Sequence, residues 1–479
     1  MHRRSFVSMT VAGTLAMAAR LVRSEASSLA GPQSQNTGDE ENLKARWLKL
    51  DNALRSWWDG DLEKADEEAI RQDATPSSPT PLGSTSPWSH SPPKTLIFLP
   101  FPYTSGGGSV GSFPEMYGWD VHFINLGLLA HGRTDIVRWN ILDQLLMIER
   151  FGKVLNGNRT FYETRGQPPL LAMSLEKYLE VKKDDDELAL LAYPLLERSF
   201  REYWNAPSHR TPIGLATCRD GGTGSDSYLE LASEAESGLD YTPIFGGDIR
   251  NCVPIHLNCA LMRQAQVLVS LSEQFGWSEK AARWRKEAED RAELINKYCW
   301  DESEGYYFEY DYVRKTRLRY YSLNAYWPLW IGIASKAQAK RLVDHLHLFD
   351  HRYGLTFTDK TYPEIHSEYK NLEWAYPECW PQQQVVVGQA LERYGFQDLA
   401  REISRRYIAN VISTWEKTGL TWERYDGVVG GHNVPVERDP AQPLHGFSSA
   451  SAVVVGRIAF NWRLHLRSNQ NEFGRRCVQ

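Results

Sequence analysis

The feature that most constrains this fold is the repetition of helical patterns from residue 121 onward. Loops rich in Gly, Pro and aromatic residues separate these patterns. Residues 254–275 illustrate them, with apolar side chains at helical spacing at Ile255, Leu257, Leu261, Met262, Ala265, Leu268, Val269 and Leu271. Few segments alternate with the period of two that marks a strand. The chain is therefore expected to be all-α.

The expected helices lie at 121–131, 134–151, 168–182, 186–204, 254–275, 278–297, 323–333, 335–348, 380–394, 396–415 and 448–467. Helices joined in pairs suit a closed double ring, an α/α barrel, whose long loops gather at one mouth and can build a site there. An open α-solenoid is the alternative, but no fixed repeat period is visible. Before these helices, residues 44–72 suggest an amphipathic helix, 75–93 a Ser/Pro-rich linker and 95–100 a short strand.

Composition excludes several classes of function. The formal charge is −6 over 479 residues and no basic stripe appears, which argues against a nucleic-acid partner. The six cysteines show no CxxC spacing, so a zinc ribbon is not expected. No metal-binding constellation stands out, and no cofactor is predicted. The chain carries 17 Trp and 23 Tyr, many beside acids in loop-like segments.

The N-terminus resembles an export signal. Arg3 and Arg4 precede an apolar run, Phe6 to Ala19, that is too short to span a bilayer. Twin arginines with a downstream Phe favour a Tat-type signal peptide over residues 1–26. The mature protein is then expected to be periplasmic or secreted, with no membrane contact after signal removal. The predicted domains are the signal peptide (1–26), an N-terminal helix and linker (27–95), the barrel (96–470) and a C-terminal tail (471–479).

The glycine-rich stretch Gly106–Asp120 is the first segment that carries chemistry. It brings Glu115, Tyr117, Trp119 and Asp120 to the start of an apolar helix. Tyr and Trp can cover the C–H face of a sugar ring, and a carboxylate can accept hydrogen bonds from sugar hydroxyls. A role in packing alone is the other interpretation. Further segments rich in acids, amides and aromatics are 153–169, 235–241, 374–383 and 420–426.

Taken in order, these segments resemble the trehalases of glycoside hydrolase family 37 and the related family 63 enzymes, which include glucosylglycerate and mannosylglycerate hydrolases. The similarity spans roughly residues 96–467. The matching motifs are Glu115-x-Tyr117-x-Trp119-Asp120, Asn156 to Arg159, Arg165 to Pro169, Glu236 to Asp240, Trp374 to Trp380, and Glu423 to Asp426. The resemblance implies a six-hairpin (α/α)6 barrel with a loop-built site at one mouth. It also implies inverting hydrolysis of an α-glycosidic bond in a small carbohydrate.

The resemblance makes Asp240 the general acid and Glu423 the general base. An inverting glycosidase needs such a pair, with the two carboxyl groups about 6.5–9.5 Å apart to admit a water. Burial beside Leu239 and Tyr241 could raise the pKa of Asp240 as an acid requires. The predicted substrate-binding residues are Phe113, Tyr117, Trp119, Asp120, Asn156, Arg165, Gln167, Arg219, Gly238, Trp374, Trp380 and Glu437. Structural alternatives are a turn cap for Asn156, an ion pair with Glu163 for Arg165 and core packing for Trp380.

Departures from the trehalase pattern lie where the leaving group would bind. Leu239 stands where trehalases carry Trp, and Glu378-Cys379 replaces an Asn-Gly pair. The expected substrate is therefore trehalose or a similar small α-glucoside, with glucosylglycerate or mannosylglycerate as the alternative. A non-catalytic sugar-binding barrel is the alternative of another class. The sequence favours no particular oligomeric state.

Overall fold

The structure is a computed structural model that describes residues 33–73, 95–111, 113–222, 226–363, 372–434 and 440–462. The predicted signal peptide, the linker 75–93, the tail 471–479 and Glu437 lie outside the described residues. By its internal contacts the chain divides into Met1–Lys49 and Leu50–Gln479. Of the first unit, the structure describes residues 33–49, which are the first part of helix α2. The second unit carries the site.

The described residues are mostly helical. The α-helices are α2 (Gln33–Trp57), α3 (Glu67–Asp73), α4 (Asp120–Ala130), α5 (Thr134–Phe151), α6 (Leu171–Val181), α7 (Asp186–Arg198), α8 (Asp226–Glu236), α9 (Ile255–Gln274), α10 (Ser278–Cys299), α11 (Trp327–Ile331), α12 (Lys336–His345), α13 (Pro381–Arg393), α14 (Gln397–Thr418) and α15 (Gly446–Ala459). Short 3-10 helices are η2 (Gly108–Val110), η3 (Thr160–Tyr162), η5 (Ile249–Asn251), η6 (Leu323–Tyr326) and η7 (Leu346–Leu348), and η4 (Ser199–Trp204) is a π-helix.

The strands are short and antiparallel. They are β1 (Leu62–Ala65), β2 (Leu99–Thr104), β3 (Cys252–Val253), β4 (Trp300–Asp301), β5 (Tyr306–Tyr307), β6 (Glu309–Asp311), β7 (Thr316–Leu318), β8 (Asp350–His351), β9 (Gly354–Leu355), β10 (Glu378–Cys379) and β11 (Tyr425–Asp426). The sheets pair β1 with β2, β4 with β5, β8 with β9 and β10 with β11, and β6 lies between β3 and β7. In the β10–β11 pair, Glu378 lies opposite Asp426 and Cys379 opposite Tyr425.

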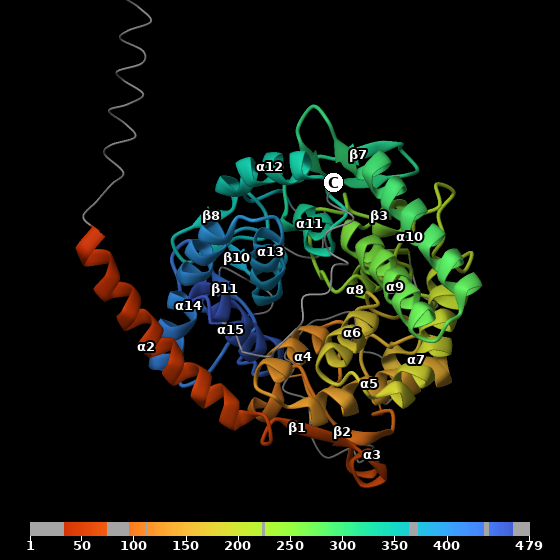
Figure 1. The fold of residues 1–479 in the computed structure, drawn as a ribbon, viewed down its shortest axis with the longest axis horizontal. Helices are drawn as coiled ribbons and strands as arrows, with labels where there is room; N and C mark the ends of the chain where they lie inside the picture. The colour runs from red at the N-terminus through yellow and green to blue at the C-terminus, as the bar shows by residue number, and fades with distance from the viewer. Residues whose placement is uncertain are drawn as a thin grey trace, which may run out of the picture. The chain divides into compact units, whose positions relative to one another are not determined.

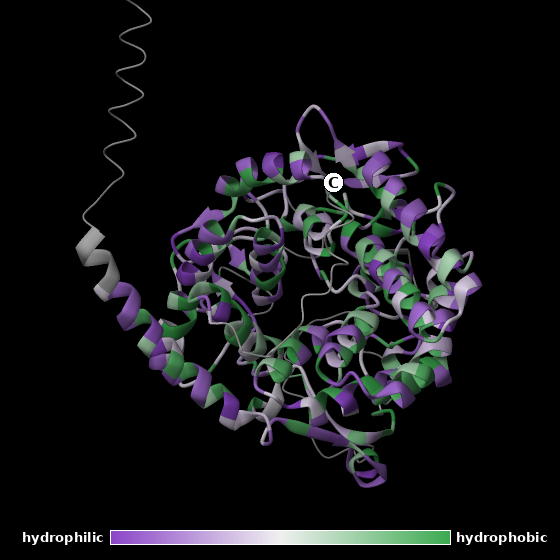
Figure 2. Cartoon of the chain, viewed as in Figure 1, coloured by the Kyte–Doolittle hydropathy of each residue, from purple (hydrophilic) through white to green (hydrophobic). Residues whose placement is uncertain are grey.

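Within the second unit, one set of helices forms a closed ring. Helices α4, α6, α9, α11, α13 and α15 contact one another in that order, and α15 contacts α4 again. Helices α5, α7, α10 and α14 pack against this ring from outside (Figure 1). The sequences agree with these positions: α15 is buried along almost its whole length, whereas α10 is rich in charge. Figure 2 shows the same contrast, with hydrophobic residues along α4 and α15 and many hydrophilic ones on α10 and α12.

The connections are unequal at the two ends of the ring. Short turns such as 131–133, 275–277 and 394–396 follow the C-terminal ends of α4, α9 and α13. Long loops instead precede the N-terminal ends of the ring helices, as in the stretch from β2 to α4 and the stretch from α14 to α15. The strand pair β10–β11 lies between two of these loops. The site loops therefore gather at the N-terminal ends of the ring helices.

The structure differs from the sequence predictions near the N-terminus. The single helix expected over 44–72 is wrong, because α2 ends at Trp57 and the chain continues as β1 and α3. The strand expected at 95–100 lies instead at Leu99–Thr104, where its partner β1 pairs Leu62 with Thr104. Helix α8 was not predicted, since its sequence DSYLELASEAE has only a narrow apolar face. Among the described residues, no helix is both long and apolar enough to cross a membrane.

Candidate active site

Asp120 stands at the first position of α4, where three predicted carboxyl groups approach one another. Its side chain is buried, with 8% of its surface exposed. The pKa of Asp120 is raised to about 8, mainly by burial; a hydrogen bond from Gln382 opposes the shift, and the charges of Glu423 and Asp240 add to it. The charge of one carboxylate shifts the pKa of another carboxyl group only when the two are close in space. The structure therefore brings Asp120, Asp240 and Glu423 together from three distant segments.

The start of α4 is held by amide side chains. Gln167 accepts a hydrogen bond from the backbone N–H of Trp119 through Oε1 at 2.9 Å. Gln144 donates to the carbonyl of Gly118 at 2.7 Å. Gln382 Nε2, in the first turn of α13, lies 3.5 Å from Asp120 Oδ1. These contacts fix the position of Asp120 from α5, α13 and the loop before α6.

The loop that carries Asp240 is anchored by Glu236, a fully buried carboxylate. Glu236 accepts hydrogen bonds from the backbone N–H of Gly166 at 2.8 Å and of Arg219 at 2.7 Å. His209 Nε2 lies 3.1 Å from it, and the hydroxyl of Tyr203 also donates to it. Burial by itself would raise the pKa of Glu236, but the charge and hydrogen bond of His209, with the other donors, hold it below its usual value. Glu236 thus ties the acid loop to the loop before α6.

Gly238 and Trp119 are in close contact inside the site. A Cβ atom built on Gly238 would lie 2.6 Å from Trp119 Cε2, and the backbone there has a φ of +76°. Only glycine meets both demands without strain. Gly238 was predicted to be a substrate-binding residue, and the group it lies against in the structure is the indole of Trp119. Tyr241, just after Asp240, also has a positive φ of 56°.

Aromatic rings line the same region. Trp374 and Trp380 stack with ring centroids 3.8 Å apart and an interplanar angle of 6°. Trp119 lies 5.8 Å from Trp374 and stacks on Trp327 at 6.4 Å. All four rings are buried. The predicted site residues Trp119, Trp374 and Trp380 therefore form one aromatic cluster, to which Trp327 also belongs although it was not predicted as a site residue.

Glu423 lies beside a buried arginine that contacts two carboxyl groups. Arg424 donates from Nη1 to Glu423, and its Nε lies 3.2 Å from Oε2 of the Glu378 carboxyl group. The Arg424 guanidinium also lies over the Trp380 ring, 5.4 Å from its centroid. Burial raises the pKa of Glu378 to about 8; the charge of Arg424 lowers it and that of Glu423 raises it. At neutral pH, Glu378 is therefore mainly protonated and Arg424 favours the ionised form of Glu423.

The remaining predicted residues fall into two groups. Asn156 and Arg165 are buried, and each has a partner: Asn156 Nδ2 donates to the carbonyl of Ala235 at 2.9 Å, and Arg165 Nη1 pairs with Asp220 at 3.0 Å. The others lie nearer the surface: Phe113 is 37% exposed, the Arg219 side chain is exposed, and the Tyr117 hydroxyl donates to Glu115 at 3.0 Å.

Sequence reasoning did not predict site roles for Gln382, Glu378 and Arg424. All three lie within the segments singled out, but only the folded chain brings Arg424 between Glu378 and Glu423. Among the described residues, no three His, Cys, Asp or Glu side chains gather so that they could hold a metal ion. Glycoside hydrolases use a pair of carboxyl groups that flank the scissile bond, and aromatic rings provide a large apolar surface beside them.

The chain belongs to the trehalase family, whose model matches residues 84–224 and 222–447. The cytosolic neutral trehalase of Kluyveromyces lactis is 26% identical over an alignment that covers 92% of this chain and 66% of that protein. The chain thus spans slightly less than two thirds of that relative's length. The solved neutral trehalase of Saccharomyces cerevisiae has a TM-score of 0.65 at 25% identity, covering 76% of this chain and 74% of that one. A family 63 mannosylglycerate hydrolase of Thermus thermophilus shares the fold, with a TM-score of 0.54 at 18% identity, over 74% and 95% of the two chains.

These relatives contradict the predicted export. The similar proteins from Kluyveromyces lactis, Saccharomyces cerevisiae and Neurospora crassa are all named cytosolic enzymes. The prediction of a Tat-type signal and a periplasmic or secreted location is therefore wrong. It depended on Arg3, Arg4 and a short apolar run, and such a short pattern of common residues arises readily without a targeting role.

Proposed function

We propose that this protein hydrolyses the α-glycosidic bond of trehalose in the cytosol, with inversion at the attacked carbon. The observation that carries the proposal is the approach of Asp240 and Glu423 to the same buried carboxyl group, Asp120. An inverting mechanism needs one protonated and one ionised carboxyl group around a single glycosidic bond. Trehalase-family membership supports trehalose as the substrate. The five cysteines of the described residues are free and buried, as expected in a reducing compartment.

In this mechanism Glu423 is the base. Its carboxylate takes a proton from a water, whose oxygen bonds to the anomeric carbon. Asp240 gives its proton to the glycosidic oxygen as the bond from that oxygen to the anomeric carbon breaks. Arg424 keeps Glu423 ionised by pairing with it, and Glu378, mainly protonated, leaves that charge available.

The innermost sugar is held by residues at and near the start of α4. Asp120 accepts hydrogen bonds from its hydroxyl groups, and Trp119 and Trp380 cover its apolar face. Asn156, Arg165 and Gln167 order the loop before α6 through their buried contacts, which supports a positioning role beside hydroxyl binding. The closed ring of α4, α6, α9, α11, α13 and α15 with its outer partners supports the six-hairpin barrel.

Two variants test the assignment. Asp240→Asn and Glu423→Gln keep side-chain size and remove only the titrating group. Each is expected to retain the wild-type unfolding temperature and lose turnover of trehalose by about 10²–10⁴-fold. Glu304→Gln, on an exposed turn outside the site, is the matched control and keeps full activity. Undiminished hydrolysis in either site variant contradicts the proposal, and faster turnover of mannosylglycerate than of trehalose by the wild type contradicts the substrate.

A further inference from the structure

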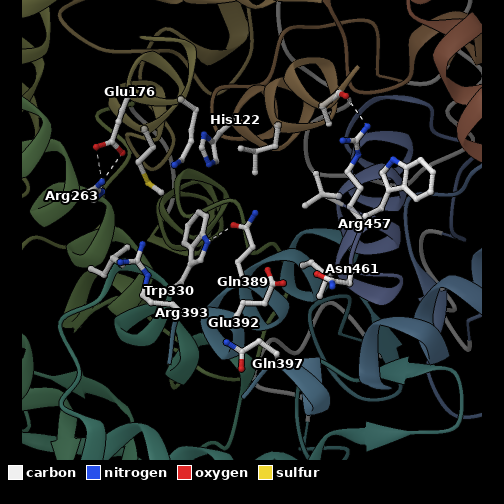
Figure 3. A pocket seen from close by; sticks show the side chains of 18 residues that line it. His122, Glu176, Arg263, Trp330, Gln389, Glu392, Arg393, Gln397, Arg457 and Asn461 are labelled. Carbon is white, nitrogen blue, oxygen red and sulfur yellow. Dashed lines mark hydrogen bonds and ion pairs between the residues drawn. The ribbon is translucent and has the colours of Figure 1, made fainter. Parts of the chain in front are cut away.

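A cavity of about 670 Å³ lies inside the ring, away from the carboxyl cluster. Residues from the last turns of α4, α13 and α15 line it, together with residues of α6, α9 and α11 (Figure 3). None of the predicted site residues that the structure describes lines it. The volume is typical of sites for small molecules. Its lining includes Arg393 and Gln397, on either side of the short turn that joins α13 to α14.

The charged lining of this cavity carries an excess of positive charge. Its basic side chains are Lys177, Arg263, Arg393 and Arg457, and its acidic ones are Glu176 and Glu392. Glu176 is already engaged, since both of its oxygens accept from Arg263 Nη2 at 2.6 Å. The cationic side chains come from four different helices, so the excess is a property of the folded ring.

Arg393 is the cation best placed for a ligand. It ends α13 and lies over Gly332, where an added Cβ atom would come within 2.9 Å of its Nη1. Burial lowers the pKa of Arg393, and the like charge of Arg263 lowers it further. Arg263 is held by Glu176 and Gln266, so Arg393 is the guanidinium group that attracts an anion to this cavity.

The inner end of the cavity offers neutral polar groups and an aromatic face. His122 is 2% exposed, and its Nε2 has no hydrogen-bond partner, while its Nδ1 lies 3.0 Å from Ser174 Oγ. Burial lowers the pKa of His122 to about 3, so the ring is neutral and its Nε2 can donate to or accept from a hydroxyl group. Trp330, 5% exposed, donates through Nε1 to Gln389 at 2.8 Å, and Figure 3 shows Gln389 in the middle of the lining.

We propose that this cavity binds a small hydroxylated anion of the sugar phosphate class. The phosphate binds Arg393, because a guanidinium group binds phosphate oxygens through paired N–H groups. The hydroxyl groups reach His122 and Gln389, and the Trp330 ring covers the apolar face of the sugar. This site goes beyond the proposed hydrolysis and does not depend on it, since a neutral disaccharide needs no cations.

Calorimetric titration of the full chain with glucose 6-phosphate tests the proposal. Wild-type protein is expected to bind it, and Arg393→Gln to weaken binding by about tenfold or more, the effect of losing one charge-assisted contact. Arg314→Gln is the matched control, because that side chain is 69% exposed and does not line the cavity. Unchanged thermal unfolding of each variant shows that the fold is kept.

Neutral and inorganic probes separate this cavity from the catalytic site. Glucose binds the catalytic site without needing Arg393, so its affinity is expected to be the same in the wild type and in Arg393→Gln. Inorganic phosphate is expected to bind more weakly than glucose 6-phosphate, because it cannot reach His122. Equal affinity of wild type and Arg393→Gln for glucose 6-phosphate overturns the proposal. So does the absence of saturable binding at millimolar concentrations, or inorganic phosphate binding as tightly as glucose 6-phosphate.

Discussion

The side-chain amide of Gln382 lies 3.5 Å from the carboxyl group of Asp120, although 262 residues separate them in the sequence. Asp120 begins α4, and Gln382 lies in the first turn of α13. The contact marks the end of the ring where the N-terminal ends of these helices meet. The Asp120 carboxyl there is buried and close to Glu423 and Asp240.

Asp120→Asn is expected to make the protein more stable at alkaline pH. The pKa of Asp120 is about 8 in the folded chain, well above the ordinary value for Asp, so ionisation between these values disfavours the folded state. The wild type therefore loses up to about 1.4 kcal/mol per pH unit relative to the variant as pH rises through this window. Thermal unfolding at pH 5, 7 and 8 measures the difference, which should grow with pH.

The matched control for this prediction is Asp135→Asn. Arg133 holds the pKa of Asp135 below its usual value, so its ionised form favours folding and the sign is reversed. This variant should be less stable than the wild type at pH 7. A pH-independent difference for Asp120→Asn would show that its carboxyl titrates normally.

Gly238→Ala tests the contact between the acid loop and Trp119. The new methyl group meets the indole at 2.6 Å and the backbone has a φ of +76°. The expected cost is about 3 kcal/mol in the free energy of unfolding, from strain and overpacking together. Chemical denaturation measures this cost, and the displaced Asp240 should also reduce turnover.

Gly419→Ala is the control, because this glycine ends α14 at a φ of +77° and nothing lies within 4 Å of an added Cβ. It isolates the backbone strain, about 1 kcal/mol. If the two substitutions reduced the free energy of unfolding equally, close contact between residue 238 and the Trp119 indole would contribute nothing to the loss.

Arg424→Gln is expected to move the acidic limb of the kcat/KM profile to higher pH. That limb reports the ionisation of the base, and Arg424 is the cation that pairs with Glu423. Glu378→Gln is the matched variant. Since the pKa of Glu378 is about 8, Gln resembles its protonated form and should leave the acidic limb unchanged. An unmoved limb in Arg424→Gln would contradict the role of Arg424.

Periodicity was sufficient to predict most helices. The helix expected at 254–275 is α9 (Ile255–Gln274), and the one expected at 134–151 is α5 (Thr134–Phe151). Periodicity failed where the local sequence pattern favours a helix but pairing with a distant strand determines the structure. Residues 62–65 form β1 because they pair with β2, which is distant in the sequence.

The motifs were sufficient to predict which residues belong to the site, but not how these residues contact one another. Asp120, Asp240 and Glu423 were singled out from separate segments, and the structure places them together. Arg424 was missed because its importance comes from lying between Glu378 and Glu423, a relationship that only the pairing of β10 with β11 creates. The cavity with Arg393 and His122 gave no local signal, since each lining residue looks like an ordinary helix residue in the sequence.

Anomer-resolved NMR of trehalose hydrolysis tests the central claim most directly. Water that attacks one anomeric carbon with inversion converts that α-linked glucose to the β form, and the other glucose leaves as the α form. Equal amounts of α- and β-glucose are expected before mutarotation, with no product from Asp240→Asn or Glu423→Gln on the same timescale. Release of α-glucose alone, or of no glucose by the wild type, would contradict inverting hydrolysis of trehalose by Asp240 and Glu423.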